Sequence, residues 1–398
     1  MPSTNYATEY CAALSQEYEH TQHFGALFAR VQEGDYRWAS AHTIEVPSIS
    51  VTGRVDGSRN SLIDKVQRHA NKWTPLTLRN HRAWNDFIHP RDIDETNQVL
   101  SIQNITRTMN QNEKFPEKDK YLVSTLYNDY LETGRVPLTG VLTTQNILQY
   151  FDLLSIMATE HNVPEAGRIL YVTTYVDVIL KGAAAFYRNL NVQGTAPASV
   201  QRAIANLDNV KVEVVPTDCM KSSYDFTVGA KVGAAAHQIQ MILIHPSCCI
   251  TPEVYDFAQL DPPSAGSQGK WEYFEESMED VFILPNKQYG LDFVVAGLGN
   301  EALTFVSAAG SATGKAKITV TAPVGAARKD GTRFFYASGS TAPDALGYGE
   351  VAPMNTAWTE WDGESEITVA NGQKMTMLAT DADGRVYAAG NNTVTAHT

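Results

Sequence analysis

Two glycine-containing stretches have spacings that resemble phosphate-binding loops. Residues 310–315 read Gly-Ser-Ala-Thr-Gly-Lys, with one residue too few between the glycines and Ala316 where a Ser or Thr would hold Mg²⁺. Residues 297–302 fit the dinucleotide pattern GxGxx[GA], but the chain is predicted to continue as β structure, so no helix N-terminus is available for a pyrophosphate. We therefore reject the first stretch as a nucleotide site and interpret the second as a flexible linker.

The strongest hint of a nucleophile lies at residues 245–249, which read His-Pro-Ser-Cys-Cys. A cysteine near a histidine suits covalent catalysis, but this run falls at the end of a predicted buried strand and has no third group to orient the histidine. Ser61 and Lys65 miss the SxxK spacing of serine–lysine hydrolases by one residue. We interpret residues 245–249 as packed core and predict that the protein is not an enzyme.

Metal sites are not indicated either. The ten histidines show no HExxH motif or other paired ligand spacing. Residues 381–384, Asp-Ala-Asp-Gly, lack the later ligands and the closing Glu of a calcium loop, and they have the composition of a hairpin turn. The sequence therefore predicts no cofactor and no metal.

The totals exclude further classes. With 398 residues, 43% of them hydrophobic, the chain is long enough for two or three packed domains. Its formal net charge of −13 repels nucleic acid and does not fit a DNA-reading role. The four cysteines show no CxxC spacing, so we expect reduced thiols in a cytosol. Glu9 and Glu17 stand where a signal peptide would be apolar, and no stretch is long and apolar enough for a membrane span.

The elements that position these residues begin with a polar arm over residues 1–42, in which the pattern allows one short helix, from Tyr10 to Tyr18. Residues 43–51 alternate apolar and polar side chains, the period-2 pattern of a half-buried strand. After a polar stretch at 52–71, residues 73–88 are again strand-like. We predict that the two strand-like stretches pair as a long hairpin with a mobile tip.

Three helices are predicted next. The first opens at Asp92, the second begins at Pro116 and stops near Gly134, and the third runs from Thr144 to about His161. Apolar residues at spacings of three and four mark the buried face of the first helix: Val99, Ile102, Ile105 and Met109.

Alternating signals then predict a compact α/β unit. Its expected elements are strands at 168–173, 210–216 and 239–244 and a helix at about 175–188. Residues 271–295 return as β structure interrupted near Pro285. From about Ala296, Gly, Ala, Thr and Ser dominate, and short alternating runs predict a separate small β-sandwich whose boundary lies between Val295 and Thr304.

This order of parts resembles the major capsid proteins of tailed bacteriophages with the Hong Kong 97 fold. The local similarity lies in residues 43–53 (TIEVPSISVTG), residues 73–94 (containing LTLRNHRAWNDFIHPRDID), Glu95-Thr96-Asn97, and residues 115–121 (FPEKDKY). The resemblance covers about residues 1–296, and its weight comes from the order of the motifs.

The resemblance implies an α+β fold with an N-terminal arm, an extended hairpin called the E-loop, a peripheral domain with a long helix, and an axial α/β domain. We interpret the added C-terminal part as an immunoglobulin-like β-sandwich. The implied function is a structural subunit that self-assembles into hexamers and pentamers of an icosahedral head around double-stranded DNA, with the E-loop lying over a neighbouring subunit. The implied partners are a separate scaffolding protein, a portal and decoration proteins, with assembly in the bacterial host cytoplasm and the virion as final location.

We assign the segments accordingly: 1–42, N-terminal arm; 43–92, E-loop hairpin; 93–143, peripheral helices; 144–270, axial domain; 271–298, returning peripheral strands; and 299–398, C-terminal β-sandwich appendage. If the last segment is an outer appendage, deletion of residues 304–398 leaves particles able to close.

The charge distribution supports contact between copies. Residues 43–92 hold eight Lys or Arg against five acids, a net +3, whereas residues 93–298 hold fourteen against twenty-four, a net −10. A basic hairpin attracts the acidic body of the next copy, and such complementarity sets register and partner choice. The predicted intersubunit contacts on the hairpin are Arg54, Arg59, Lys65, Arg68, Lys72, Trp73 and Arg79.

Two other classes of protein stay open. A phage tail-tube or baseplate protein also combines β-sandwiches with extended hairpins, although the helices between Asp92 and His161 argue against it. The third hypothesis is an acidic hydrolase whose site is assembled from distant residues, and it requires loss of turnover on mutation of His245 or Cys248.

Overall fold

The computed structural model describes these parts of the chain: residues 20–28, 36–40, 42–54, 56, 68–95, 102–183, 206–323 and 328–398. They form two compact units. The first consists of Met1–Leu122 with Cys249–Lys287, and the second of Val123–Cys248 with Gln288–Thr398. The helix predicted from Tyr10 to Tyr18 lies outside the described residues.

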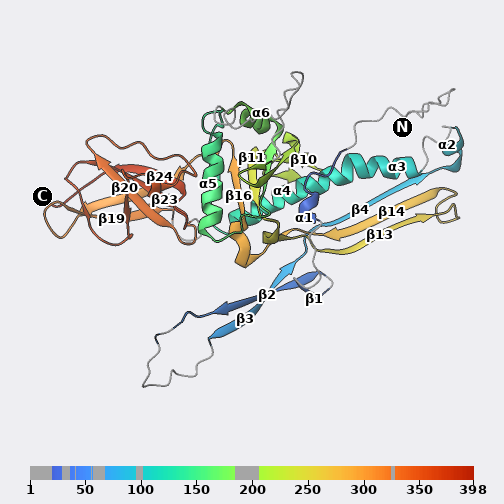
Figure 1. Cartoon of the computed structure of the whole chain (residues 1–398), viewed down its shortest axis with the longest axis horizontal. Helices are drawn as coiled ribbons and strands as arrows, with labels where there is room; N and C mark the ends of the chain where they lie inside the picture. Colours follow the sequence, from blue (N-terminus) through green and yellow to red (C-terminus); the bar gives the residue numbers. More distant parts are fainter. Residues whose placement is uncertain are drawn as a thin grey trace, which may run out of the picture. The chain divides into compact units, whose positions relative to one another are not determined.

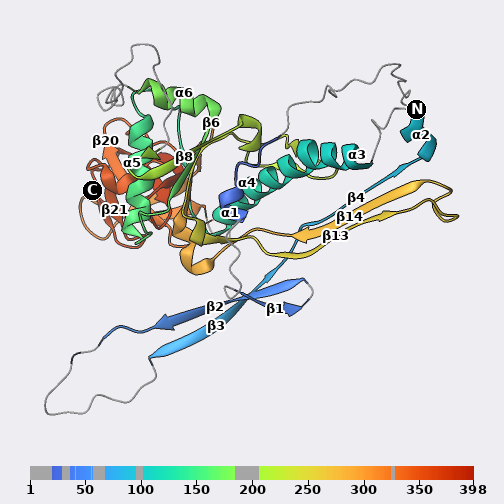
Figure 2. The same cartoon turned by 45° about the vertical axis from the view of Figure 1, so that its right-hand side comes forward.

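A β-hairpin dominates the N-terminal part of the first unit. Strands β2 (Thr43–Val51) and β3 (His69–Thr77) pair antiparallel, and β1 (Arg37–Ser40) adds a third strand at the free edge of β2. The register places Ile44 opposite Leu76. Figure 1 and Figure 2 both show β2 and β3 side by side. The strand predicted at residues 43–51 from its period-2 pattern is confirmed.

The second half of the predicted hairpin needs a correction. Residues 73–88 are not one strand, because β3 ends within them and β4 (His81–Ile88) pairs with β14 (Trp271–Glu279) instead of β2. Leu78, between β3 and β4, is buried in an apolar cluster with Ile44, and this anchor marks the point where the chain changes partners. The alternation within each half was correct, but it carries no information on a partner strand so far along the chain.

Strand β14 is the centre of the second sheet of this unit. The sheet has the order β13–β14–β4, and both pairings are antiparallel. Strand β13 (Glu253–Asp261) falls within residues 144–270 of the sequence assignment, yet it joins the sheet of β4. A short pair, β12 (Cys249–Ile250) and β15 (Phe282–Ile283), adds buried side chains to the cluster around Ile44.

The helical elements of this region are α1 (Gly25–Phe28), α2 (Pro90–Glu95), α3 (Ile102–Met109), a π-helical turn (Asn110–Lys114) and α4 (Phe115–Glu132). Helix α2 starts two residues before the predicted Asp92. The predicted start at Pro116 is not a new N-terminus, because the π-helical turn joins α3 directly to α4. The predicted stop near Gly134 is confirmed, and that glycine takes the left-handed conformation that ends many helices (φ 81°).

The second unit is built on a six-stranded sheet, in the order β5 (Leu138–Thr139), β16 (Leu291–Val295), β11 (Ile239–Ile244), β6 (Ile169–Thr173), β8 (Val210–Val215) and β7 (Asn206–Leu207). Its helices α5 (Ile147–Glu160) and α6 (Thr174–Gly182) share one apolar core with it. Figure 1 shows α5 beside β16. The strands and helices predicted at 168–244 are confirmed to within a few residues at each end, and the part of the helix predicted after 183 lies outside the described residues. Strand β16 was assigned to the returning peripheral strands at 271–298, but it pairs with β11 in this sheet.

The last part of the second unit contains two sheets. One is five-stranded, in the order β17 (Glu301–Ala302), β24 (Val386–Thr393), β23 (Lys374–Thr380), β20 (Arg333–Gly339) and β21 (Thr359–Trp361). The other is three-stranded, in the order β18 (Thr304–Ala309), β19 (Lys315–Ala322) and β22 (Ile367–Thr368). Buried residues from both sheets form one apolar cluster, which includes Phe305, Ile318 and Met377. We call residues 299–398 the C-terminal β-domain.

Candidate intersubunit surface

The distal half of the β2–β3 hairpin exposes side chains on both faces. Ile49 and Val51 are 74% and 76% exposed on one face, and Ser50 is exposed on the other. Opposite them, all residues of β3 from His69 to Trp73 are exposed. A two-stranded hairpin with no core on either side is only marginally stable in water, so this ribbon fits a surface that another molecule completes.

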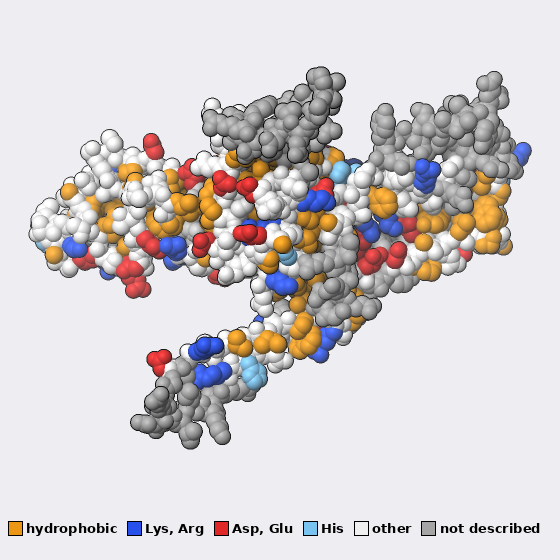
Figure 3. Space-filling view, viewed as in Figure 1, with side chains coloured by type: hydrophobic (Ala, Val, Ile, Leu, Met, Phe, Trp, Pro, Cys, Tyr) orange, Lys and Arg blue, Asp and Glu red, His pale blue; other side chains and the backbone are white. Residues whose placement is uncertain are grey.

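The predicted contact residues on this ribbon are basic. Arg54 and Lys72 are exposed and Arg68 is half-buried. Figure 3 shows Lys and Arg side chains gathered on the hairpin. Arg59 and Lys65 lie outside the described residues. Together, the described side chains give the ribbon a positive and partly aliphatic surface.

Trp73 contacts its own chain at the base of the ribbon. The Arg37 guanidinium lies 3.8 Å from the centroid of the Trp73 ring, and its Nε donates to Glu45 Oε2 at 2.8 Å. Trp73 keeps 37% of its surface exposed. The stacked arginine therefore fixes the orientation of an indole that still presents one part to solvent.

Arg79 is held within the first unit, at the root of the hairpin. Its backbone N–H donates to Asp280 Oδ2 at 2.7 Å, and its Nε lies 3.3 Å from the same oxygen. The other carboxylate oxygen of Asp280 accepts from the Tyr121 hydroxyl at 2.9 Å and from the Val281 N–H at 2.7 Å. Asp280 is 2% exposed, so one buried carboxylate ties the β3–β4 turn to α4 and to the end of β14.

An ion-pair ladder joins the helical face to the sheet β13–β14–β4. It consists of Arg82 Nε to Glu117 Oε1 at 2.6 Å, Lys114 Nζ to Glu275 Oε1 at 3.2 Å, and Lys118 Nζ to Glu279 Oε2 at 2.6 Å. Burial raises the pKa of Glu279, and attraction to Lys118 offsets this only in part. Burial also pulls the pKa of Lys118 down, but attraction to Glu279 outweighs it and the pKa of Lys118 is raised.

Sequence reasoning missed this ladder because it treated charges as solvated. A signal was present, since Lys114 and Lys118 stand one helical turn apart while Glu275 and Glu279 share one face of a strand. The equal spacing of the two lysines and of the two glutamates predicts ion pairs only once the helix is known to pack on β14.

The opposite face of the same sheet carries aromatic rings and carboxylates. Phe87 is 61% exposed and Phe274 is 37% exposed, and the rings of Phe274 and Phe257 lie 6.3 Å apart. Alternation along β14 directs Glu272 and Glu276 to this face, because Glu275 between them is buried on the helical side. On this face His81 pairs with Glu276 and Lys270 lies over the Phe87 ring. Phe274 and Glu272 are therefore the apolar and acidic side chains that complement the aliphatic and basic ribbon.

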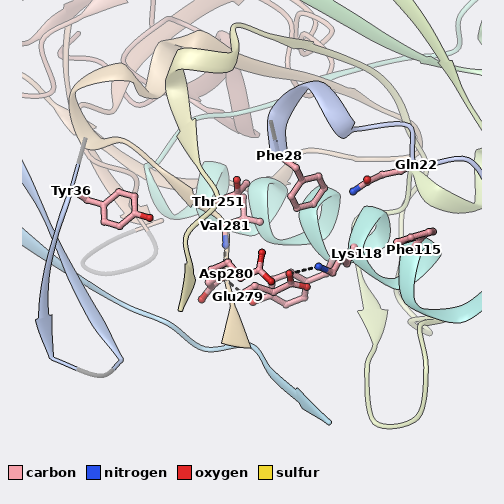
Figure 4. Close-up of a pocket in the computed structure, with 11 residues that line it drawn as sticks. Gln22, Phe28, Tyr36, Phe115, Lys118, Thr251, Glu279, Asp280 and Val281 are labelled. Atoms are coloured by element: carbon pink, nitrogen blue, oxygen red, sulfur yellow. Dashed lines mark hydrogen bonds and ion pairs between the residues drawn. The ribbon is translucent and has the colours of Figure 1, made fainter. Parts of the chain in front are cut away.

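A cavity of about 380 Å³ lies in the first unit beside α4. Figure 4 shows Lys118 and Glu279 paired at its wall, with Phe28 and Phe115 nearby. The buried hydroxyl of Thr251 also lines it and has no hydrogen-bond partner among the described residues. Lys118 and Glu279 are paired with each other and Asp280 is paired with Arg79, and among the described residues no group of His, Cys, Asp and Glu could hold a metal ion.

The candidate nucleophilic residues at 245–249 pack within the fold. Cys248 and Cys249 are buried, and His245 Nδ1 lies 2.7 Å from Ser247 Oγ of the same short turn.

Helices in the described ranges are too short or too polar to cross a membrane.

Comparison with known proteins gives the class of fold. No family model matches the sequence, and no curated protein matches it. The chain is similar to the capsid structure of cyanophage P-SCSP1u, with a TM-score of 0.55 and 9% identity over 73% of this chain and 93% of that one. It is also similar to the mature capsid of bacteriophage PhiM1, with a TM-score of 0.53 and 10% identity over 73% of this chain and 92% of that one.

These neighbours define the chain as a mixed α+β protein with the fold of phage capsid proteins. The resemblance read from the sequence is confirmed at that level. Identities of about 10% establish the fold alone.

Proposed function

We propose that the chain is the structural subunit of a tailed-phage head, with a Hong Kong 97-like fold, and that it assembles into hexamers and pentamers of an icosahedral shell around double-stranded DNA. The observation that carries the proposal is the β2–β3 ribbon, exposed on both faces in a chain that has a phage capsid fold. Such a ribbon gains stability only when a second molecule covers it.

Complementary surfaces on one chain support self-association. The ribbon offers Ile49, Arg54 and Lys72, and the outer face of β13–β14–β4 offers Phe274 and Glu272. Contact between two different patches of identical chains is heterologous, and it closes into rings when the rotation allows. Ring-shaped capsomers are the expected product.

The remaining assignments belong to the same proposal. The β2–β3 hairpin is the E-loop, the sheet β13–β14–β4 with α3 and α4 is the peripheral domain, and the six-stranded sheet is the core of the axial domain. The two facing sheets of the C-terminal β-domain support an immunoglobulin-like sandwich. A scaffolding protein, a portal and decoration proteins are proposed partners, assembly takes place in the host cytoplasm, and the final location is the virion.

The test is assembly of the purified full chain, followed by negative-stain electron microscopy and sedimentation velocity. We expect capsomers or closed shells. A strictly monomeric species at high concentration would refute the proposal, and open stacked rings would favour the tail-tube alternative.

The role of the hairpin is tested by charge neutralisation. Replacing Arg54, Arg68 and Lys72 together with Gln should weaken assembly, and the difference from the unmodified chain should shrink as salt screens the attraction. The matched control replaces three exposed lysines elsewhere with Gln: Lys231, Lys317 and Lys374. Equal effects of the two triple variants would remove the electrostatic argument for the hairpin.

A further inference from the structure

One turn of the C-terminal β-domain carries charged side chains that are buried within the second unit. Residues 381–385 join β23 to β24, and the side chain of Arg385 is fully buried. Its Nη1 donates to Asp292 Oδ1 at 2.7 Å and to the Val136 carbonyl oxygen at 2.8 Å, while its Nη2 donates to the second oxygen of Asp292. Asp292 belongs to β16, so the turn places a cation against the central six-stranded sheet.

Asp292 is a buried carboxylate that depends on this cation. It is 3% exposed, and it also accepts from the Tyr130 hydroxyl at 2.9 Å. Burial alone raises the pKa of Asp292, but attraction to Arg385 and to Arg135 outweighs burial and holds the pKa below its ordinary value. Arg135 lies further away, with 3.6 Å between its Nη2 and Asp292 Oδ2. The close pairing therefore comes from Arg385.

Neighbouring residues of the turn make further bonds to the same region. Asp381 Oδ2 accepts from the backbone N–H of Val136 at 2.9 Å. Asp383 pairs with His161 Nε2 at 2.8 Å, and its other oxygen lies 3.6 Å from Arg135 Nε. The side chain of Val136 in turn belongs to the apolar core of the C-terminal β-domain. The turn thus makes polar bonds to the region around Val136, and Val136 in return packs into the apolar core of the C-terminal β-domain.

We infer that docking of the C-terminal β-domain completes the axial core, because the turn at residues 381–385 provides the cation that pairs with Asp292. Only chains synthesised through Arg385 then have a stable axial core and can assemble. Arg385 follows Asp292 by 93 residues. Until the turn docks, Asp292 lacks the cation that bonds to it directly, and only Arg135 lies near it, at 3.6 Å, a state that disfavours the folded sheet. The inference replaces the expectation that residues 304–398 are a removable appendage.

The assembly step in this inference rests on the proposed function, but its structural step does not. Amide hydrogen exchange of β16 in the unassembled full chain measures whether the turn has docked. The yield of particles measures whether the docked chain assembles. A chain whose unmodified form makes no particles would refute the proposed function while leaving the exchange result to decide the structural step.

The experiment compares three full-length variants with the unmodified chain. Arg385→Met removes the cation and should raise amide exchange in β16 by at least about 100-fold, with loss of particles. Arg385→Met combined with Asp292→Asn removes both charges and should restore most of the protection and yield. Arg333→Met breaks an exposed ion pair with Glu360 in the same domain and should change neither.

If Arg385→Met gives no soluble protein, recovery of soluble protein in the double variant supports the inference. Failure of the double variant as well would overturn it, because the defect would then not come from an unpaired charge. Protection of β16 in Arg385→Met equal to that in Arg333→Met would overturn it too.

Discussion

Asp280 should be the residue on which the attachment of the hairpin root depends most. Its carboxylate accepts from two backbone N–H groups, those of Arg79 and Val281, from the Tyr121 hydroxyl, and from the Arg79 side chain. Asp280→Ala removes every one of these acceptors in a place where water has little access.

The magnitude follows from the chemistry of the donors. A hydrogen bond to a charged group contributes roughly 1.5–3 kcal/mol, and a buried donor left without an acceptor costs roughly 1–3 kcal/mol. Because the losses at Arg79, Tyr121 and Val281 overlap and Arg79 Nε can turn to solvent, we expect Asp280→Ala to cost about 3–5 kcal/mol. Asp280→Asn keeps one carbonyl acceptor and should cost about 1–2 kcal/mol.

The assay is urea unfolding of the unassembled chain, with hydrogen exchange over residues 76–82 as a local readout. Glu45→Ala is the matched control, because it removes a carboxylate from the partly exposed Arg37–Glu45 pair and should cost less than about 1 kcal/mol. If Asp280→Ala is no more destabilising than Glu45→Ala, and exchange at residues 76–82 is unchanged, the anchoring argument is wrong.

Three further outcomes are expected. Ile44→Ala, in the cluster under the hairpin, should cost about 2–5 kcal/mol in urea unfolding, whereas Ile49→Ala on the exposed ribbon should be nearly neutral; similar costs would contradict the assigned burial. Because the pKa of Asp292 is lowered in the folded state, its ionised carboxylate stabilises the fold at neutral pH, and this stabilisation is lost as pH falls through that pKa. Asp292→Asn should therefore make the free energy of unfolding less dependent on pH in the acid range. An unchanged acid dependence would contradict this role of Asp292. Tyr130→Phe should cost about 1–2 kcal/mol in the same measurement by removing one donor to Asp292, and a stabilising effect would be inconsistent with that bond.

Local pattern predicted much of the element inventory. Period-2 alternation gave β2, a short buried apolar run gave β11 at Ile239–Ile244, and apolar spacing gave α5. These signals lie within the elements themselves. The partner of β4 lies in β14, about 190 residues away, and no local period encodes that pairing.

The positions of charged residues in the sequence did not indicate which of these side chains are buried. Arg79 contacts Asp280 of its own chain through its backbone and side chain, and its predicted contact with another subunit stays a prediction. Residues 381–384 were read correctly as a hairpin turn, but composition gave no sign that Arg385 beside it is buried. Burial of an ion depends on which distant group arrives opposite it, and that information is tertiary.

The π-helical turn at Asn110–Lys114 sets the rotational phase between two successive helices. Its wider turn lets Ile105 of α3 face Trp84 and Tyr273 while Lys114 and Lys118 still face the carboxylates of β14. If these same residues took regular α-helical geometry instead, the turn would no longer absorb its extra residue and α3 would rotate by about 100° about its axis. Ile105 would then point away from the rings of Trp84 and Tyr273. The π-helical turn therefore lets α3 and α4 both contact the same sheet.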